Sequence, residues 1–153
     1  MSTDDLSRSA WRQRLRKRRR CLDHDHAQTA ARKAAEHLSG DPLWQAQHIA
    51  LYLCNDGELD PAAIARAAWE AGKQIYLPVI SPLGMQFCPW HASDPLTPNR
   101  YGIGEPESEP VATSTLELLL LPTVGWSASG FRLGMGGGYY DRFLASEQCA
   151  AAL

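Results

Sequence analysis

The sequence feature that most restricts how this chain can fold is a glycine-rich stretch near its C-terminal end. Four glycines fall within five positions, at Gly134, Gly136, Gly137 and Gly138. Each glycine costs conformational entropy on folding, but it permits positive φ and close approach of the backbone to a ligand. The apolar run at residues 116–121 predicts a buried strand before this stretch, and a helix is expected to begin at Tyr139. A glycine-rich turn at the start of a helix presents free N–H groups at its positive end, which favours phosphate binding.

The residues alone leave two interpretations of this loop open. It is not a Walker A loop, because no Gly-Lys-Ser/Thr follows, and it is not a dinucleotide fingerprint, because Tyr139 takes the place of the third glycine. One interpretation is a tightly turned connection without a ligand, and the other is a phosphate site. Arg132, Asp141 and Arg142 flank the loop, and charges of both signs favour a site that holds phosphate together with a metal cation.

Length and composition indicate one ordinary globular domain. The chain has 153 residues, of which 44% are apolar and 21% charged. No apolar run approaches the roughly 20 residues that span a bilayer, and no apolar signal segment opens the chain, so we expect a cytoplasmic protein. The four cysteines are widely spaced without a Cys-x-x-Cys pair, which favours reduced thiols over disulfides or zinc. They are Cys21, Cys54, Cys88 and Cys149.

The charges are distributed unevenly along the chain. Eight of the 15 basic residues lie between Arg8 and Arg20, which leaves seven against all 17 acidic residues elsewhere. Residues 4–22 are expected to form a helix in which arginines recur every four residues as one cationic stripe. This stripe has three interpretations: a solvated charge run, an arm that binds nucleic acid, or a set of arginines that reach the phosphates held by the glycine loop.

The rest of the sequence predicts alternating strands and helices. Strands are expected at residues 48–53, 74–80, 85–90 and 116–121, with the second and third as a hairpin, and helices at 26–38 and 62–71. Asp60 and Pro61 are expected to start the second of these helices, and residues 91–111 to form a long loop whose Tyr101–Pro106 part covers a pocket. Residues 23–26 alternate Asp and His, which we assign to a solvated turn between helices. This order is typical of an α/β layered domain.

Glu58 lies in a polar loop directly after the strand at residues 48–53. Ligands collect at the carboxyl ends of the strands in open α/β sheets, so a ligand contact is one interpretation of this carboxylate. From the residues alone, an exposed loop carboxylate is favoured.

Taken together, these stretches resemble the 5-formyltetrahydrofolate cyclo-ligase family, also called 5,10-methenyltetrahydrofolate synthetase. The resemblance rests on the segment from Arg132 to Asp141, the basic helix with Arg8 and Arg12, the stretch at residues 53–58 and the loop at 101–106. It implies a three-layer, Rossmann-like open sheet, mostly parallel, flanked by helices and preceded by the basic helix. It also implies that MgATP and 5-formyltetrahydrofolate are converted to 5,10-methenyltetrahydrofolate, ADP and phosphate.

The resemblance also assigns roles to residues, and it reverses the interpretation of Glu58. Substrate contacts are implied at Leu53, Glu58, Met135, Gly136, Gly137, Gly138 and Tyr139. Arg132 and Tyr140 are implied as catalytic, and Asp141 as a Mg²⁺ ligand. ATP contacts are implied at Arg8, Ser9, Ala10, Trp11, Arg12, Arg132, Leu133, Gly134, Met135, Gly136, Gly137, Gly138, Tyr139 and Tyr140.

One departure from the family bears on these expectations. Members of the family usually continue beyond the Tyr-Tyr-Asp motif into more sheet and a second metal-binding aspartate, whereas this chain ends at Leu153. The family's C-terminal strands are therefore expected to be absent, with residues 1–153 as one cyclo-ligase domain. The partners expected are ATP and the folate, without nucleic acid or membrane, and the chain is expected to be a monomer. The alternatives are a nucleic-acid-binding module that uses the basic arm, and a shortened, inactive member that still binds nucleotide.

Overall fold

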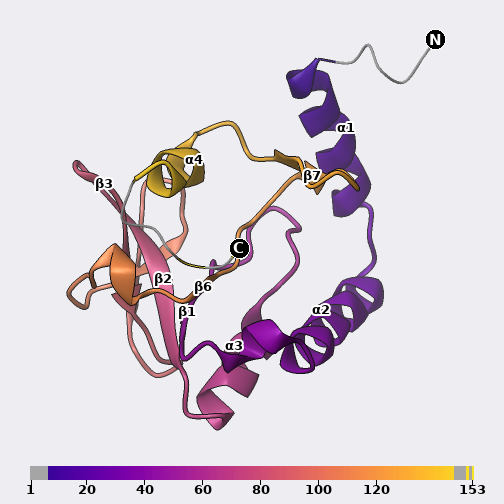
Figure 1. Ribbon diagram of the computed structural model, residues 1–153. Coiled ribbons are helices and arrows are strands. Elements are labelled where there is room, and N and C mark those ends of the chain that lie inside the picture. The colour runs from indigo at the N-terminus through magenta and orange to yellow at the C-terminus, as the bar shows by residue number, and fades with distance from the viewer. Residues whose placement is uncertain (1–6, 147–150, 152) are drawn as a thin grey trace.

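The computed structural model describes residues 7–146, 151 and 153, and its centre is a four-stranded sheet with the strand order β3-β2-β1-β6 (Figure 1). β1 (His48–Ala50) pairs in parallel with both β2 (Gln74–Ser81) and β6 (Leu118–Leu119). β3 (Gly84–Pro89) is antiparallel to β2 at one edge, which confirms the predicted hairpin. The sheet is therefore mostly parallel, as expected.

Helices cover both faces of this sheet. α2 (His24–Ser39) and α3 (Ala62–Glu70) pack on one face, where Ala35, Ile64 and Ala68 join the buried strand residues Ile49 and Ile75. α4 (Tyr139–Leu144) packs on the other face. There the ring of Phe143 meets the ring of Phe87 edge-on, with centroids 5.0 Å apart. The three-layer α/β arrangement is thus confirmed.

Two predicted strands are shorter in the structure. β1 ends at Ala50, although the N–H of Leu51 still donates to the carbonyl of Tyr76 at 2.9 Å. β6 comprises Leu118 and Leu119 alone, although residues 116–121 were expected to be extended. In both cases the apolar residues after the strand remain buried or partly buried, so the apolar sequence extends beyond the strand itself.

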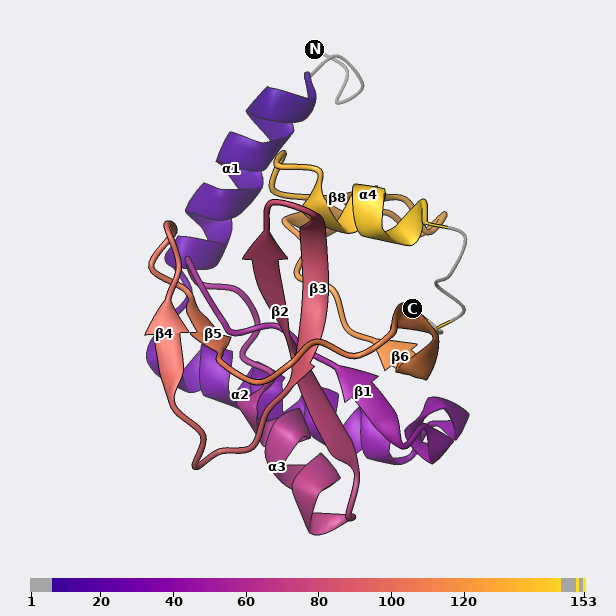
Figure 2. The same cartoon turned by 90° about the vertical axis from the view of Figure 1, so that its left-hand side faces the viewer.

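Helix α1 (Arg8–Arg20) stands beside β7 (Gly125–Trp126) in Figure 1, and Figure 2 shows it above α2 at one side of the molecule. None of its residues is fully buried. The Ser7 hydroxyl caps its start by accepting from the N–H of Ala10 at 3.2 Å. Residues 4–6 of the predicted helix lie outside the described residues. Leu15 packs so closely on Gly125 that a Cβ there would lie 2.5 Å from a Leu15 methyl group.

The interpretation of residues 23–26 as a turn is wrong. α2 already begins at His24, and the Asp23 carboxylate caps it by accepting from the N–H of His26 at 2.7 Å. An aspartate before a helix is a strong N-cap, and this signal outweighs the alternation of Asp and His. The start of α3 was predicted one residue too early, because Pro61 is the N-cap and not the first helical residue. Asp60 still accepts from the N–H of Ala62 at 2.9 Å.

Small elements interrupt stretches that were predicted as loops. Within residues 91–111, β4 (Leu96–Pro98) and β5 (Gly104–Pro106) form an antiparallel pair. Between β6 and the glycine-rich loop, β7 pairs with β8 (Arg132–Leu133). The described part of the chain also contains two 3-10 helices, η2 (Pro42–Gln45) and η3 (Thr113–Thr115).

The thiols of Cys21, Cys54 and Cys88 are free, as predicted for them, while Cys149 lies outside the described residues. None of the helices in the described part of the chain has the length and apolar character needed to cross a bilayer.

Replacing Phe87 tests how far the α4 layer depends on this core. Phe87 is 2% exposed, so Phe87→Ala is expected to lower the free energy of unfolding by about 3–5 kcal/mol. The matched control is Phe131→Ala, which removes a ring that is 76% exposed and is expected to change stability by less than about 0.5 kcal/mol. Denaturant unfolding followed by circular dichroism measures both variants. Equal losses would contradict this assignment of the core.

Candidate functional site

A cavity of about 770 Å³ opens at the carboxyl ends of the parallel strands. Chain segments that follow β1 and β6 contribute Leu53 and Pro122, and the last part of β2 contributes Ile80. Parallel strands end at the same edge of a sheet, so loops distant in sequence meet there. The remaining walls come from the start of α1, the 99–105 segment and residues 130–141.

Most residues implied by the family resemblance line this cavity. They are Arg8, Arg12, Leu53, Glu58, Arg132, Leu133, Gly134, Met135, Gly136, Gly137, Gly138, Tyr139, Tyr140 and Asp141. Ser9, Ala10 and Trp11 are not among the lining residues. Residues four apart share one face of a helix, so Arg8 and Arg12 face the cavity together while the three between them project elsewhere. The Trp11 ring instead lies beneath the guanidinium of Arg14, and Arg14 Cζ is 5.4 Å from the centroid of that ring.

The carbonyls of the glycine-rich loop, residues 134–138, are held from outside by arginines. Arg12 Nε donates to the carbonyl of Gly134 at 2.8 Å, and Arg142 Nη1 donates to that of Gly137 at 3.0 Å. Gly136 and Gly138 adopt φ of +106° and +71°, a region that favours glycine. Among the described residues, no protein group accepts a hydrogen bond from the N–H groups of this loop. Free N–H groups next to Arg8 and Arg12 are well suited to an anion.

Glu58 lies on a different wall and is half-buried. Its Oε2 accepts from the N–H of Asn55 at 3.0 Å, and burial raises the pKa of its carboxyl group above the usual range. The expectation from the residues alone, an exposed loop carboxylate, is therefore wrong. The strand before Glu58 ends early, and the turn that follows brings the side chain back towards the cavity.

Two tyrosine hydroxyls lie near Glu58. Burial is the main cause that raises the pKa of Tyr52 and of Tyr140, and the charge of Glu58 raises both further. Tyr52 donates to the carbonyl of Leu59 at 2.6 Å. A tyrosine hydroxyl is already protonated at neutral pH, and the raised pKa values extend this to higher pH, so both hydroxyls can act as hydrogen-bond donors but not as bases.

The turn between β4 and β5 reaches the glycine-rich loop, so the prediction that residues 101–106 border a pocket is confirmed. The hydroxyls of Tyr101 and Tyr139 are 2.9 Å apart, and Arg100 also donates to the hydroxyl of Tyr139. Glu105 holds the base of this turn by accepting from the N–H of Ile80 at 3.0 Å and from the Asn99 amide at 2.9 Å.

Asp141 and Arg132 lie together at the edge of the cavity. An Asp141 oxygen is 4.0 Å from Arg132 Nη2, and the Asp141 side chain is 85% exposed. Among the described residues, no group of three or more metal-ligating side chains occurs. Mg²⁺ usually keeps several waters and binds through one or two carboxylates plus substrate phosphates, so a single exposed carboxylate beside a loop suited to an anion fits this ion.

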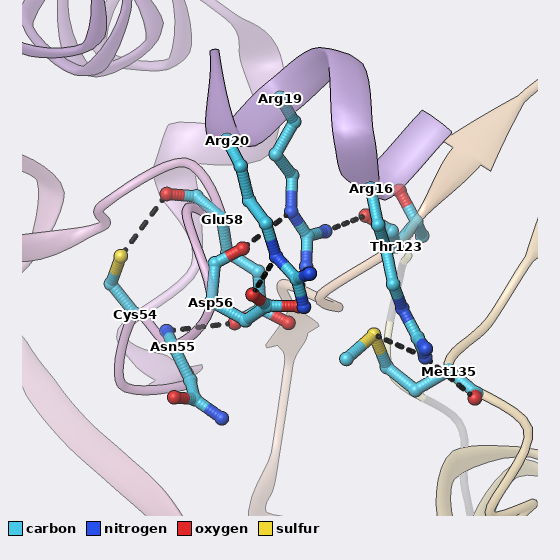
Figure 3. Close-up of polar contacts among 9 residues, drawn as sticks. All are labelled: Arg16, Arg19, Arg20, Cys54, Asn55, Asp56, Glu58, Thr123 and Met135. Carbon is cyan, nitrogen blue, oxygen red and sulfur yellow. Dashed lines mark hydrogen bonds and ion pairs between the residues drawn. The ribbon is translucent and has the colours of Figure 1, made fainter. Parts of the chain in front are cut away.

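Sequence reasoning missed several residues that support the site (Figure 3). Arg16 Nη2 donates to the carbonyl of Met135 at 3.0 Å, and Asp56 binds two arginines of α1. The four-residue spacing of the stripe contains a signal for Arg16, because Arg16 shares a face with Arg12. Nothing in the local sequence identifies Asp56, whose partners lie more than 30 positions earlier.

Comparison with known proteins finds one family. Residues 4–152 match the model of the "5-formyltetrahydrofolate cyclo-ligase family". A 5-formyltetrahydrofolate cyclo-ligase of Escherichia coli is 37% identical over 141 residues, which cover 88% of this chain and 78% of that protein. The Haemophilus influenzae protein of that name is 37% identical over 110 residues, covering 68% of this chain and 59% of the relative. The solved structure of Aquifex aeolicus 5,10-methenyltetrahydrofolate synthetase superposes with a TM-score of 0.83 at 26% identity, covering 95% of this chain and 75% of that one.

The conformation of the glycine-rich loop can be tested by a matched pair of variants. Gly136→Ala is expected to lower the free energy of unfolding by about 1–2 kcal/mol, because an L side chain rarely adopts φ of +106°. In the control, Gly134→Ala, the added Cβ meets nothing within 4 Å and the backbone is outside the left-handed region. This control is expected to be neutral or to stabilise by up to about 1 kcal/mol. Denaturant unfolding decides, and equal effects would contradict the loop conformation.

The raised pKa of Glu58 predicts a pH dependence of stability. Because the folded state binds this proton more tightly than the unfolded state, ionisation of Glu58 destabilises the fold as pH rises from the ordinary pKa of 4.5 through the raised value. Glu58→Gln removes this titration while keeping an oxygen for the N–H of Asn55. The variant's stability relative to the unsubstituted chain should therefore increase across that pH interval, measured by urea unfolding at several pH values. A difference independent of pH would contradict the burial of this carboxylate.

Proposed function

The chain belongs to the 5-formyltetrahydrofolate cyclo-ligase family, and from this premise we propose that it converts 5-formyltetrahydrofolate and ATP into 5,10-methenyltetrahydrofolate, ADP and phosphate. The observation that carries the proposal is a single cavity with two different linings. One contains the glycine-rich loop with Arg8 and Arg12, and the other contains Glu58 with two tyrosines. We further propose that residues 1–153 act as one domain.

The chemistry explains why both linings are needed. The formyl oxygen on N5 is a poor leaving group, and transfer of the γ-phosphoryl group of ATP to that oxygen makes it a good one. N10 then attacks the formyl carbon, phosphate departs with the oxygen, and N10 loses its proton as the ring closes. Phosphoryl transfer depends mainly on positioning and on stabilisation of charge. The site must therefore hold the triphosphate and the formyl group together.

The glycine-rich loop and the arginines around it are proposed to hold the triphosphate. The N–H groups of residues 134–138 donate to no protein acceptor among the described residues, so they are available to phosphate oxygens. Arg8 and Arg12 add positive charge from α1, and Arg132 adds it from β8. Arg132 is proposed to stabilise the charge that develops on the transferring group.

The second lining is proposed to receive the folate. Glu58, as a half-buried carboxylate, accepts hydrogen bonds, which suits the amino and ring N–H donors of a pterin. Tyr140 keeps its proton because of its raised pKa and can donate to an oxygen of the substrate. Leu53 adds apolar surface to the same cavity.

Asp141 is proposed to hold the Mg²⁺ ion that accompanies ATP. When bound, such an ion neutralises phosphate charge. Asp141 contributes a hard carboxylate oxygen at the edge of the cavity, in the first turn of α4. Arg132 Nη2 lies 4.0 Å from this carboxylate.

A nucleic-acid-binding role for α1 is less well supported, because much of its cationic stripe is already occupied. Arg12 and Arg16 bind carbonyls of the glycine-rich loop, and Arg19 and Arg20 bind Asp56. The remaining exposed cations of this helix are accompanied by one aromatic residue, Trp11, which offers no continuous surface for stacking bases.

The proposed function is tested by mixing the purified chain with 5-formyltetrahydrofolate and MgATP and following the absorbance of methenyltetrahydrofolate. We expect turnover with one ADP formed for each product. In Asp141→Asn, the Mg²⁺ concentration for half-maximal rate should rise about ten-fold or more, because a ligand charge is lost. Binding of 5-formyltetrahydrofolate without ATP should be unchanged in this variant.

Asp25→Asn is the matched control, since Asp25 is an exposed aspartate in the first turn of another helix, α2. It should leave the Mg²⁺ dependence as it is. Absence of product from a folded chain would contradict the proposed reaction. Unaltered Mg²⁺ dependence in Asp141→Asn would contradict the role of this residue alone.

A further inference from the structure

Asp56 lies at the corner of the turn that carries Glu58, and it is bound to the last turn of α1 (Figure 3). Its Oδ2 is 3.2 Å from Arg19 Nη2, and its Oδ1 is 2.5 Å from Arg20 Nε. Arg19 Nε also donates to the main-chain carbonyl of Asp56 at 2.7 Å. Arginines of α1 thus bind both the side chain and the backbone of Asp56, and they lower the pKa of its carboxyl group.

The backbone of this turn is well defined. Asp56 and Gly57 have φ of +51° and +73°, and the N–H of Glu58 donates to the carbonyl of Asn55 at 3.1 Å. Positive φ at both central residues, closed by this bond, is typical of a type I′ turn. Among the described residues, Asp56 is the only residue other than glycine with positive φ. The Glu58 carboxylate then folds back on the N–H of Asn55, so its position depends on this turn.

The ion pair with Arg19 has the geometry expected of a structural anchor. The Arg19 side chain is 12% exposed, and Arg19 Nη1 also contacts the carbonyl of Thr123 at 3.5 Å, next to the cavity-lining Pro122. The Arg20 side chain is 59% exposed, so its pair with Asp56 is more screened by solvent. No residue of α1 is fully buried, and polar contacts such as these help to hold the helix in place.

We propose that Asp56 is a positioning residue for the folate side of the site, which acts by anchoring the Glu58 turn to Arg19 of α1. The inference rests on the proposed function, because it assigns Glu58 to the folate. Arg12 and Arg16 of the same helix bind the glycine-rich loop, so α1 connects the two linings of the cavity. Loss of the Asp56 anchor releases the Glu58 turn while the contacts of α1 with the glycine-rich loop remain.

Asp56→Asn isolates the charge of this anchor. Asparagine tolerates the left-handed conformation and keeps a side-chain oxygen, so the turn itself can still form. We expect the Kd for 5-formyltetrahydrofolate, measured by tryptophan fluorescence without ATP, to rise about ten-fold because a binding group is misplaced. The Kd for ATP should stay within about two-fold, and KM for the folate should rise more than kcat falls.

Arg19→Met removes the other partner and keeps an apolar side chain of similar reach. It should also lower folate affinity, and the loss in the double variant should be smaller than the sum of the two single losses, because both substitutions remove the Asp56–Arg19 ion pair. The matched control is Glu36→Gln, which breaks a carboxylate–arginine pair of 2.6 Å on α2 whose side chains are both 61% exposed. This control should leave both Kd values unchanged.

The outcomes separate the two proposals. If the unsubstituted chain neither binds nor converts 5-formyltetrahydrofolate, the proposed function is overturned, and this inference with it. If the unsubstituted chain binds the folate and Asp56→Asn binds it equally well, the inference alone is overturned. Equal weakening of folate and ATP binding in a folded Asp56→Asn protein also overturns it, because the role would then be general stability.

Discussion

The bonds that arginines of α1 make to two loops are the interactions on which the geometry of the site depends. No residue of α1 is fully buried, and Leu15 packs against Gly125. Like charges four residues apart repel, and the last turn of the helix is entirely basic. The helix dipole and the carboxylate of Asp56 offset this repulsion at one end. The carbonyls of the glycine-rich loop do so further along the same face.

The parallel sheet determines which loops α1 can reach. β1 lies between β2 and β6, so the segments that leave β1 and β6 start side by side at the same edge. One of them carries Asp56 and Glu58, and the other leads through β7 and β8 to the glycine-rich loop. The sheet therefore brings residues separated by about half of the chain to one cavity. No direct bond between the two loops is required. The packing of Phe143 on Phe87 fixes the far end of the glycine-rich loop, because α4 begins where that loop ends.

Local sequence signals predicted the scaffold and part of the site. Caps and periodicity gave α2 and α3 to within a few residues, and the alternation of strands and helices indicated the layered fold. The strand pairs β4–β5 and β7–β8 were not predicted. Their strands have only two or three residues, some of them Pro or Gly, and are too short to show a hydrophobic periodicity in the sequence. The family resemblance predicted that Glu58 contacts a ligand, whereas its neighbours in the sequence favoured an exposed side chain. Asp56 could not be found by either route, since its role depends on a turn with positive φ and on arginines of another element.

The charges around the cavity also determine how a ligand can be oriented within it. Arg8 and Arg12 lie beside loop N–H groups that donate to no acceptor among the described residues, and this side of the cavity attracts negative charge. On the other side, burial raises the pKa of Glu58, and its carboxylate repels negative charge when it is ionised. Two ligands match this distribution of charge when one places its phosphates at the glycine-rich loop and the other places hydrogen-bond donors at Glu58. The reverse placement would set phosphate against the Glu58 carboxylate. Because α1 contacts both linings, the separation between them is determined by one rigid helix. The register of the arginines along α1 is therefore a constraint on the reaction as well as on the fold.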